Sequence, residues 1–237
     1  PWSPPAWMKD NGNVAGGSLL REHYGVYARY FVKYIQAFQK EGVTIQAVTT
    51  QNEPECDQFG MSPTCLWTGE QEMAFIVNHL APALKAAGLQ TKPWLWDHNF
   101  DGTNRVAQVL AQKGVLERIG AVAWHPYVGQ PEWIKPIHAK YPDLPMVMTE
   151  MGPHVDRYRR DMLWWGDLMM RTFNSGCGGF TSWCMVCWTN TASRTSRAAS
   201  RARASSNSTP SRARPCRASS SRRSAMSGGS FAAARTS

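Results

Sequence analysis

The stretch AVTTQNEPE, residues 47–55, decides the fold because a segment suited to burial ends there in charge. Its first four residues are small, apolar or β-branched, which is typical of a strand inside a protein. Gln51, Asn52 and Glu53 follow without a break, and Pro54 ends the run. A strand that carries an ionisable carboxylate at its carboxyl end predicts a functional site at that end of the sheet.

Short apolar segments alternate with amphipathic ones up to residue 186. Residues 18–41 have the one-sided apolar spacing of a helix, and we expect that face to pack on a sheet. Thr68 and Gln71 have the spacing of a capping box at the start of the next helix, in which Pro82 predicts a kink. The expected helices are 18–41, 70–87, 103–117, 131–140 and 157–174, and the expected strands are 43–50, 92–98, 119–125, 145–150 and 178–186.

This alternation predicts βαβ units and a parallel sheet. In a (β/α)8 barrel the carboxyl ends of the strands form the active-site face. A doubly wound sheet also binds ligands at strand ends, but the chain has no glycine-rich phosphate loop. The polar and aromatic residues at the ends of the expected strands are Asn52, Glu53, Asp97, His98, His125, Glu150 and Trp183.

Two of these strand-end residues are carboxylates, Glu53 and Glu150. A pair of carboxyl groups that face each other across the open end of a barrel can catalyse hydrolysis of a glycosidic bond. One group must hold a proton while the other is ionised, and a retaining enzyme needs them about 5–5.5 Å apart. Aromatic rings at neighbouring strand ends would stack on sugar rings, and these are Trp2, Trp96, Tyr127 and Trp183. Because tryptophan buries a large area, Trp96 by itself is expected more in the core than on such a platform.

Six segments, in order along the chain, carry a resemblance to a known family. They are PWSPPAWMKDNG, AVTTQNEP, LWDHNFDG, AVAWHPY, VMTEMG and GFTSWCM. Together they make residues 1–186 similar to the central and later barrel of glycoside hydrolase family 30, the glucosylceramidase-like retaining β-glycosidases. The resemblance implies an α/β fold: an incomplete (β/α)8 TIM barrel with about strands 3 to 8, and without the family's side β-domain.

The resemblance also implies roles for single residues. Glu53, which follows Asn52, corresponds to the general acid/base, and Glu150 corresponds to the nucleophile. Asn52 is similar to the asparagine that hydrogen-bonds the sugar 2-hydroxyl, a contact that strengthens in the transition state. The other positions correspond to residues that line the family's glycone pocket, and they are Trp2, Asp97, His125, Tyr127 and Trp183.

No metal or organic cofactor is implied, because the chemistry needs only two carboxyl groups and water. We expect His125 to orient its neighbours or a hydroxyl group rather than bind a metal, and Asp97 either to anchor its surroundings or to contact the ligand. The spacing of the six cysteines along the chain matches no common zinc pattern. Cys56 and Cys65 flank a loop and could form a disulfide, whereas Cys177 lies in an apolar run typical of a buried free thiol.

Residues 187–237 differ in composition from the rest of the chain. They hold ten of the 26 basic residues and no acidic one, so residues 1–186 carry 16 basic against 17 acidic residues and the net charge of +9 belongs to the tail. We expect residues 1–186 to be a partial catalytic barrel and the tail to be disordered and of low complexity. A basic arm that binds nucleic acid is the alternative.

A change of reading frame near Val186 is the interpretation of this tail that we favour. Permitted codons for Cys187–Thr195, read one frame away, encode Leu-Asp-Glu-His-Gly-Gln-Pro-Asn. This peptide is similar to the loop that follows the corresponding strand in the family. The nucleotide sequence across Val186 tests the hypothesis.

The expected substrate is a β-linked glucoside, glycolipid or oligosaccharide, with glucosylceramide-like substrates first and β-1,6-glucan or β-xylosides next. A binder that has lost catalysis is a further alternative, although both carboxylates are present. No apolar run reaches the roughly 18 residues that cross a membrane, and the family suggests a secreted or periplasmic protein. Because the chain begins at Pro1 without a signal-like segment, we expect missing barrel strands and no activity from this chain alone.

Overall fold

A computed structural model describes residues 1–152 and 158–183 of the chain. In this part, five parallel strands form one sheet, and their order in the sheet is their order in the sequence. Such a sequential parallel order is that of a barrel wall, whereas a doubly wound sheet reverses its order at a switch point. The strands are β1 (Ala47–Thr49), β2 (Lys92–Asn99), β3 (Ala121–His125), β4 (Met146–Met148) and β5 (Cys177–Phe180).

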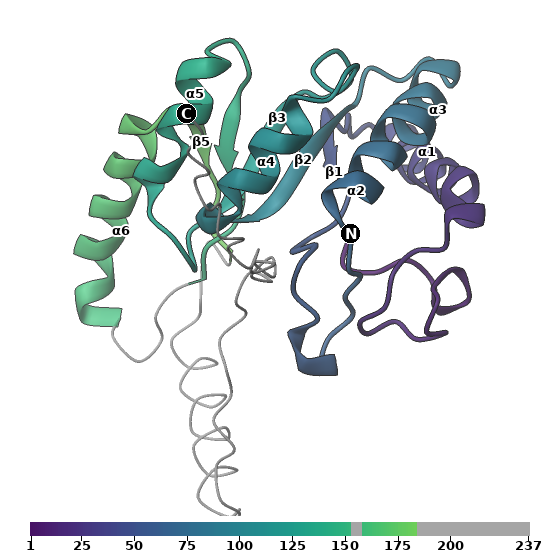
Figure 1. Cartoon of the computed structure of the whole chain (residues 1–237), viewed down its shortest axis with the longest axis horizontal. Coiled ribbons are helices and arrows are strands. Elements are labelled where there is room, and N and C mark those ends of the chain that lie inside the picture. The colour runs from purple at the N-terminus through teal and green to yellow at the C-terminus, as the bar shows by residue number, and fades with distance from the viewer. Residues whose placement is uncertain (153–157, 184–237) are drawn as a thin grey trace, which may run out of the picture.

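Helical segments connect the strands (Figure 1). Helices α1 to α3 lie beside β1 at one end of the sheet, α4 lies beside the middle strands, and α5 and α6 lie at the β5 end. Within the described ranges, none of the helices combines the length and apolar character that a membrane crossing needs. The helices are α1 (Tyr24–Lys40), α2 (Gly69–Phe75), α3 (Ala81–Ala86), α4 (Thr103–Leu110), α5 (Lys135–Lys140) and α6 (Tyr158–Asn174).

The predicted α/β fold and the partial barrel are therefore confirmed, with shorter elements than expected. The first strand was predicted over 43–50, but only Ala47–Thr49 are paired, because β2 begins opposite Ala47. Of the last predicted strand, residues 184–186 lie outside the described residues, as does the tail 187–237.

The helix predicted over 70–87 begins as expected but does not continue as one α-helix. Thr68 and Gln71 form the capping box, with both reciprocal hydrogen bonds present. A π-helical turn, Ile76–Leu80, then separates α2 from α3. The turn lies directly before Pro82, which has no N–H to donate to the preceding turn and so weakens the regular α-helical ladder there.

Only one row of the apolar residues on α1 is buried. Tyr27, Phe31 and Ile35 pack against the second helical segment, and Phe75 lies within 5.6 Å of the Tyr27 ring centroid. Tyr30 and Tyr34 are 53% and 44% exposed. The expectation that the whole stripe packs on the sheet is wrong, because the apolar arc of α1 is wider than the surface its neighbours cover.

Candidate active site

A bulge at the carboxyl end of β2 sets the geometry of the strand ends. The register between β2 and β3 shifts between Trp96 and His98, and Trp96 and Asp97 have φ values of 82° and 56°. Non-glycine residues in this region cost about 1–3 kcal/mol each, and a bulge redirects the side chains that follow it. Asp97 consequently lines the hollow at the sheet's carboxyl edge, where regular alternation would have placed Trp96.

Trp96 instead packs among the core residues on the α4 side and is 1% exposed. Its ring lies 4.9 Å from the Arg105 guanidinium carbon. A Cβ atom at Gly102 would lie 1.9 Å from the ring, so only glycine fits there. Trp96 is thus a core residue, as preferred for it, and does not stack on a sugar ring, because the bulge turns this side chain away from the strand ends.

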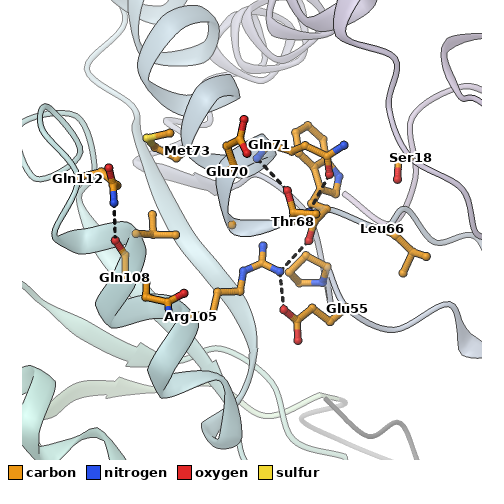
Figure 2. Close-up of a pocket in the computed structure, with 14 residues that line it drawn as sticks. Ser18, Glu55, Leu66, Thr68, Glu70, Gln71, Met73, Arg105, Gln108 and Gln112 are labelled. Atoms are coloured by element: carbon orange, nitrogen blue, oxygen red, sulfur yellow. Dashed lines mark hydrogen bonds and ion pairs between the residues drawn. The ribbon is translucent and has the colours of Figure 1, made fainter. Parts of the chain in front are cut away.

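A buried ion network behind the sheet holds the bulge. Glu72 of α2 is fully buried, and its Oε1 accepts hydrogen bonds from the Trp96 backbone N–H at 2.9 Å and from the Thr50 hydroxyl at 2.8 Å. Its Oε2 accepts from Arg105 at 2.8 Å. Arg105 also donates to Glu55 at 2.8 Å and to the Trp67 carbonyl at 2.7 Å (Figure 2). This network links α2, α4 and the loop after Glu53.

Asp97 joins the ends of three other strands. Its Oδ2 accepts a hydrogen bond from the Thr49 hydroxyl at 2.6 Å, and its Oδ1 accepts one from the Thr149 hydroxyl at 2.6 Å. His125 Nε2 lies 3.1 Å from the same Oδ1. Burial alone would raise the pKa of Asp97, but His125 and the two threonine hydroxyls bring it below its usual value. Asp97 is thus an ionised anchor across β1, β3 and β4.

Glu53 lies at the tip of β1 in a left-handed backbone conformation, with φ of 49°. Its backbone N–H donates to the Asp97 carbonyl at 3.0 Å, and its Oε2 accepts from Gln58 Nε2 at 2.6 Å. Its other oxygen, Oε1, faces two imidazoles, with Nδ1 of His125 at 3.5 Å and Nδ1 of His98 at 3.8 Å. The side chain is therefore held on both sides and is nearly buried.

Glu150 follows β4 and is half-buried. Its Oε1 accepts a hydrogen bond from the Tyr127 hydroxyl at 3.0 Å, and the Gly152 backbone N–H donates to the same hydroxyl at 2.9 Å. Tyr127 thus fixes the carboxylate. This contact differs from the sugar stacking that the sequence suggested for Tyr127, although the ring is 42% exposed and offers a free face as well.

The two carboxyl groups have opposite pKa shifts. Burial would raise the pKa of Glu53, but the nearby imidazoles of His125 and His98 and the hydrogen bond from Gln58 lower it overall. Burial raises the pKa of Glu150, against the lowering effects of the His125 charge and the Tyr127 hydrogen bond, and the charges of Glu53 and Asp97 add to the rise. Burial would likewise lower the pKa of His125, yet its two carboxylate neighbours raise it to about 9. Glu150 therefore holds a proton more readily than Glu53 does.

A hollow of about 480 Å³ lies at the carboxyl edge of the sheet. The Trp2 and Trp183 rings border it with centroids 5.8 Å apart, and Trp183 is 48% exposed. Glu53, His125 and Tyr127 are not among its lining residues. The sequence-predicted residues that line it are Trp2, Asn52, Asp97, Glu150 and Trp183.

A second cavity, of about 670 Å³, lies between α2 and α4 (Figure 2). None of the predicted site residues lines it, and Trp67, its one aromatic side chain, is 3% exposed. A sugar ring there would find no accessible aromatic face. The strand-end hollow is therefore the candidate active site.

Several residues of the site were not expected from the sequence. Thr49, Thr149 and Gln58 hold the acidic groups directly, and Glu72 and Arg105 act from behind the sheet. Thr49 and Thr149 lie near the ends of the two strands that carry Glu53 and Glu150, and this repeat in the sequence could have indicated their role. The possible Cys56–Cys65 disulfide is not formed, because Cys65 is a free, buried thiol, and Cys177 is free and buried as expected.

Comparison with known proteins gives a family and several relatives. Residues 1–192 match the family model described as "Glycosyl hydrolase family 30 TIM-barrel domain". The chain is 41% identical over 164 residues to endo-1,6-beta-D-glucanase BGN16.3 of Trichoderma harzianum, covering 63% of this chain and 33% of that protein. It is 34% identical over 136 residues to lysosomal acid glucosylceramidase of Mus musculus, covering 54% of this chain and 26% of that protein.

A solved structure is also similar. The endo-beta1,6-glucanase BT3312 superposes with a TM-score of 0.71 at 32% identity, over 77% of this chain and 44% of that chain. The chain spans 33 to 40% of the length of the fungal relatives that it matches. The family model nevertheless covers most of the chain, including every strand of the sheet. The chain therefore belongs to glycosyl hydrolase family 30.

Proposed function

We propose that this chain is barrel sequence of a retaining β-glycosidase that hydrolyses β-1,6-linked glucan. The observation that carries the linkage is the 41% identity to a fungal enzyme of that name, supported by the similar solved structure of another. We therefore propose β-1,6-glucan as the preferred substrate, whereas the sequence motifs alone favoured glucosylceramide-like substrates. Because the chain spans only part of these relatives, the activity of the whole protein is part of the proposal.

The proposed mechanism uses the two strand-end carboxyl groups in turn. Glu150 attacks the anomeric carbon while Glu53 protonates the departing glycosidic oxygen, which breaks the glycosidic bond and leaves a glycosyl ester on Glu150. Glu53 then takes a proton from water, and the water oxygen displaces Glu150. Tyr127 holds the attacking carboxylate, and Asn52 supplies the contact to the 2-hydroxyl.

This assignment of roles rests on the motifs, because the pKa of Glu53 is lowered and that of Glu150 is raised, which is the opposite of what the first step needs. A glycosidic oxygen that accepts a hydrogen bond from the Glu53 carboxyl group favours its protonated form, which raises the pKa of that group. Positive charge that develops on the sugar favours the ionised form of Glu150. Substrate binding therefore favours a protonated Glu53 and an ionised Glu150, as the first step requires.

A chimera tests the function. Residues 1–186 replace the matching segment of the Trichoderma enzyme, and release of reducing sugar from linear β-1,6-glucan is measured. We expect hydrolysis by the chimera and a loss of at least a thousandfold in both Glu53→Gln and Glu150→Gln. A folded chimera without activity, or one that is indifferent to Glu150→Gln, contradicts the proposal. Parallel assays of residues 1–237 alone test the expectation that this chain is inactive by itself.

A glucosylceramide-like β-glucoside is the second candidate substrate, favoured by the 34% identity to the mouse glucosylceramidase. The same chimera, assayed with glucosylceramide in mixed micelles, separates the two. Faster turnover of the lipid than of the glucan would reverse the order proposed here. A β-xyloside serves as the third arm.

The division into a partial barrel, 1–186, and a tail, 187–237, stays a proposal, because the tail lies outside the described residues. Sequencing the DNA across Val186 tests the frameshift. Deleting the tail and measuring the salt dependence of nucleic-acid affinity tests the basic-arm alternative. Equal affinity with and without the tail would exclude that alternative.

A further inference from the structure

Three buried side chains from three strand ends converge beside the hollow. Glu53 follows β1, His98 lies in β2, and His125 ends β3, and they are 7%, 5% and 0% exposed. One ligand atom from each lies within 4.8 Å of the other two. Glu53 Oε1 is 3.5 Å from His125 Nδ1 and 3.8 Å from His98 Nδ1. The mechanism above uses Glu53 but gives His98 no task.

Within the described part of the chain, neither of these ring nitrogens makes a hydrogen bond of good geometry, and both face the same Glu53 oxygen at 3.5 and 3.8 Å. A buried polar atom without a partner costs about 1–3 kcal/mol, so two beside one carboxylate oxygen call for an explanation. The contact of His125 Nε2 with Asp97 fixes the ring so that Nδ1 is directed at Glu53. Two nitrogen donors and one carboxylate oxygen thus point at a common space.

We propose that Glu53 Oε1, His98 Nδ1 and His125 Nδ1 form a binding site for a divalent transition metal of the zinc type. Zinc lies about 2.0–2.1 Å from such ligands, which puts tetrahedral ligands about 3.3 Å apart. The two carboxylate–imidazole separations exceed this by about 0.2 and 0.5 Å, and the two imidazoles, at most 4.8 Å apart, must approach by up to about 1.5 Å, so both rings rotate toward the metal. The metal also displaces the proton that His125 carries beside Glu53, and this proton is released to water. A water molecule would take the fourth position.

The donor set selects the class of metal. Two imidazole nitrogens suit zinc, cobalt or nickel, whereas magnesium and calcium require oxygen ligands. Asp97 supports the site from behind, because metal-binding histidines usually contact a carboxylate through their other ring nitrogen. The Asp97 Oδ1 to His125 Nε2 distance of 3.1 Å provides this contact before any metal binds.

A metal bound at this site would inhibit glycoside hydrolysis rather than assist it. A metal on Glu53 Oε1 occupies the oxygen that must carry the proton in glycoside hydrolysis. Binding of the metal itself needs no substrate, so it is independent of the function proposed above. Only the inhibition depends on that function.

The test is a metal titration of the purified full chain, with Co²⁺ alone followed by visible absorbance and Zn²⁺ alone by calorimetry. We expect one equivalent of Co²⁺ to give the absorption of a tetrahedral site and Zn²⁺ to abolish it. Glu53→Gln, which keeps the shape of the side chain, and His98→Asn should each weaken Zn²⁺ binding at least tenfold.

Exposed Glu22 and half-buried His23, 3.7 Å apart, provide matched controls. Glu22→Gln and His23→Asn should leave the Zn²⁺ affinity within twofold. Zn²⁺ should also raise the melting temperature of the unaltered chain but not that of Glu53→Gln. This comparison still tests the metal site if His98→Asn does not fold. Absence of the cobalt band, or equal Zn²⁺ affinity in Glu53→Gln, overturns the proposal.

Discussion

Replacement of Glu72 by Gln should destabilise the chain strongly, although Glu72 lies behind the sheet. Its carboxylate is fully buried and accepts from Thr50, the Trp96 backbone and Arg105 at 2.8–2.9 Å. A glutamine oxygen can still accept two of these bonds, but its amide group then faces the guanidinium. Breaking a buried ion pair costs about 3–5 kcal/mol. Because Arg105 still donates hydrogen bonds to Glu55 and to the Trp67 carbonyl, we expect a loss of unfolding free energy at the lower end of this range.

A loss of about 3 kcal/mol corresponds to roughly 6–12 °C in melting temperature for a chain of this size. Thermal unfolding followed by circular dichroism measures it. Glu70→Gln is the control, because its bridge to Arg21 is exposed on both sides and such pairs contribute about 0–1 kcal/mol. If Glu72→Gln lowers the melting temperature no more than Glu70→Gln does, the buried network does not hold the bulge and the reasoning fails.

Three other changes test separate contacts. Tyr127→Phe removes a hydrogen bond to an ionised group, so in the chimera kcat should fall about 10- to 100-fold without a change in melting temperature; unchanged kcat would remove Tyr127 from the site. Gly102→Ala places a methyl group against the Trp96 ring and should cost about 1–3 kcal/mol in thermal unfolding, whereas Gly166→Ala, with open space around it, should not destabilise. Burial raises the pKa of the Cys65 thiol to about 11, so at pH 8 a thiol reagent should modify Cys65 only when the chain unfolds, as peptide mass spectrometry can follow; labelling of folded chain at the rate of a free thiol would contradict this.

The sheet could be predicted because its information is local. Alternating apolar segments and the residues at their ends gave the parallel order and placed Glu53 and Glu150 on one edge. The bulge at Trp96 could not be predicted, since it depends on Glu72 and Arg105, which are near Trp96 only in the fold. For the same reason the sequence did not indicate the convergence of His98 and His125 on Glu53.

Backbone strain is concentrated at the candidate site. In the described residues, the non-glycine residues with positive φ are Glu53, Gln58, Trp96 and Asp97. At about 1–3 kcal/mol each, their conformations cost several kcal/mol, which surrounding contacts must offset. Those contacts include the bonds from Trp96 to Glu72 and from Glu53 to the Asp97 carbonyl. Stability and geometry therefore depend on the same bonds, so Glu72→Gln should lower kcat in the chimera as well as the melting temperature, even though Glu72 touches no substrate.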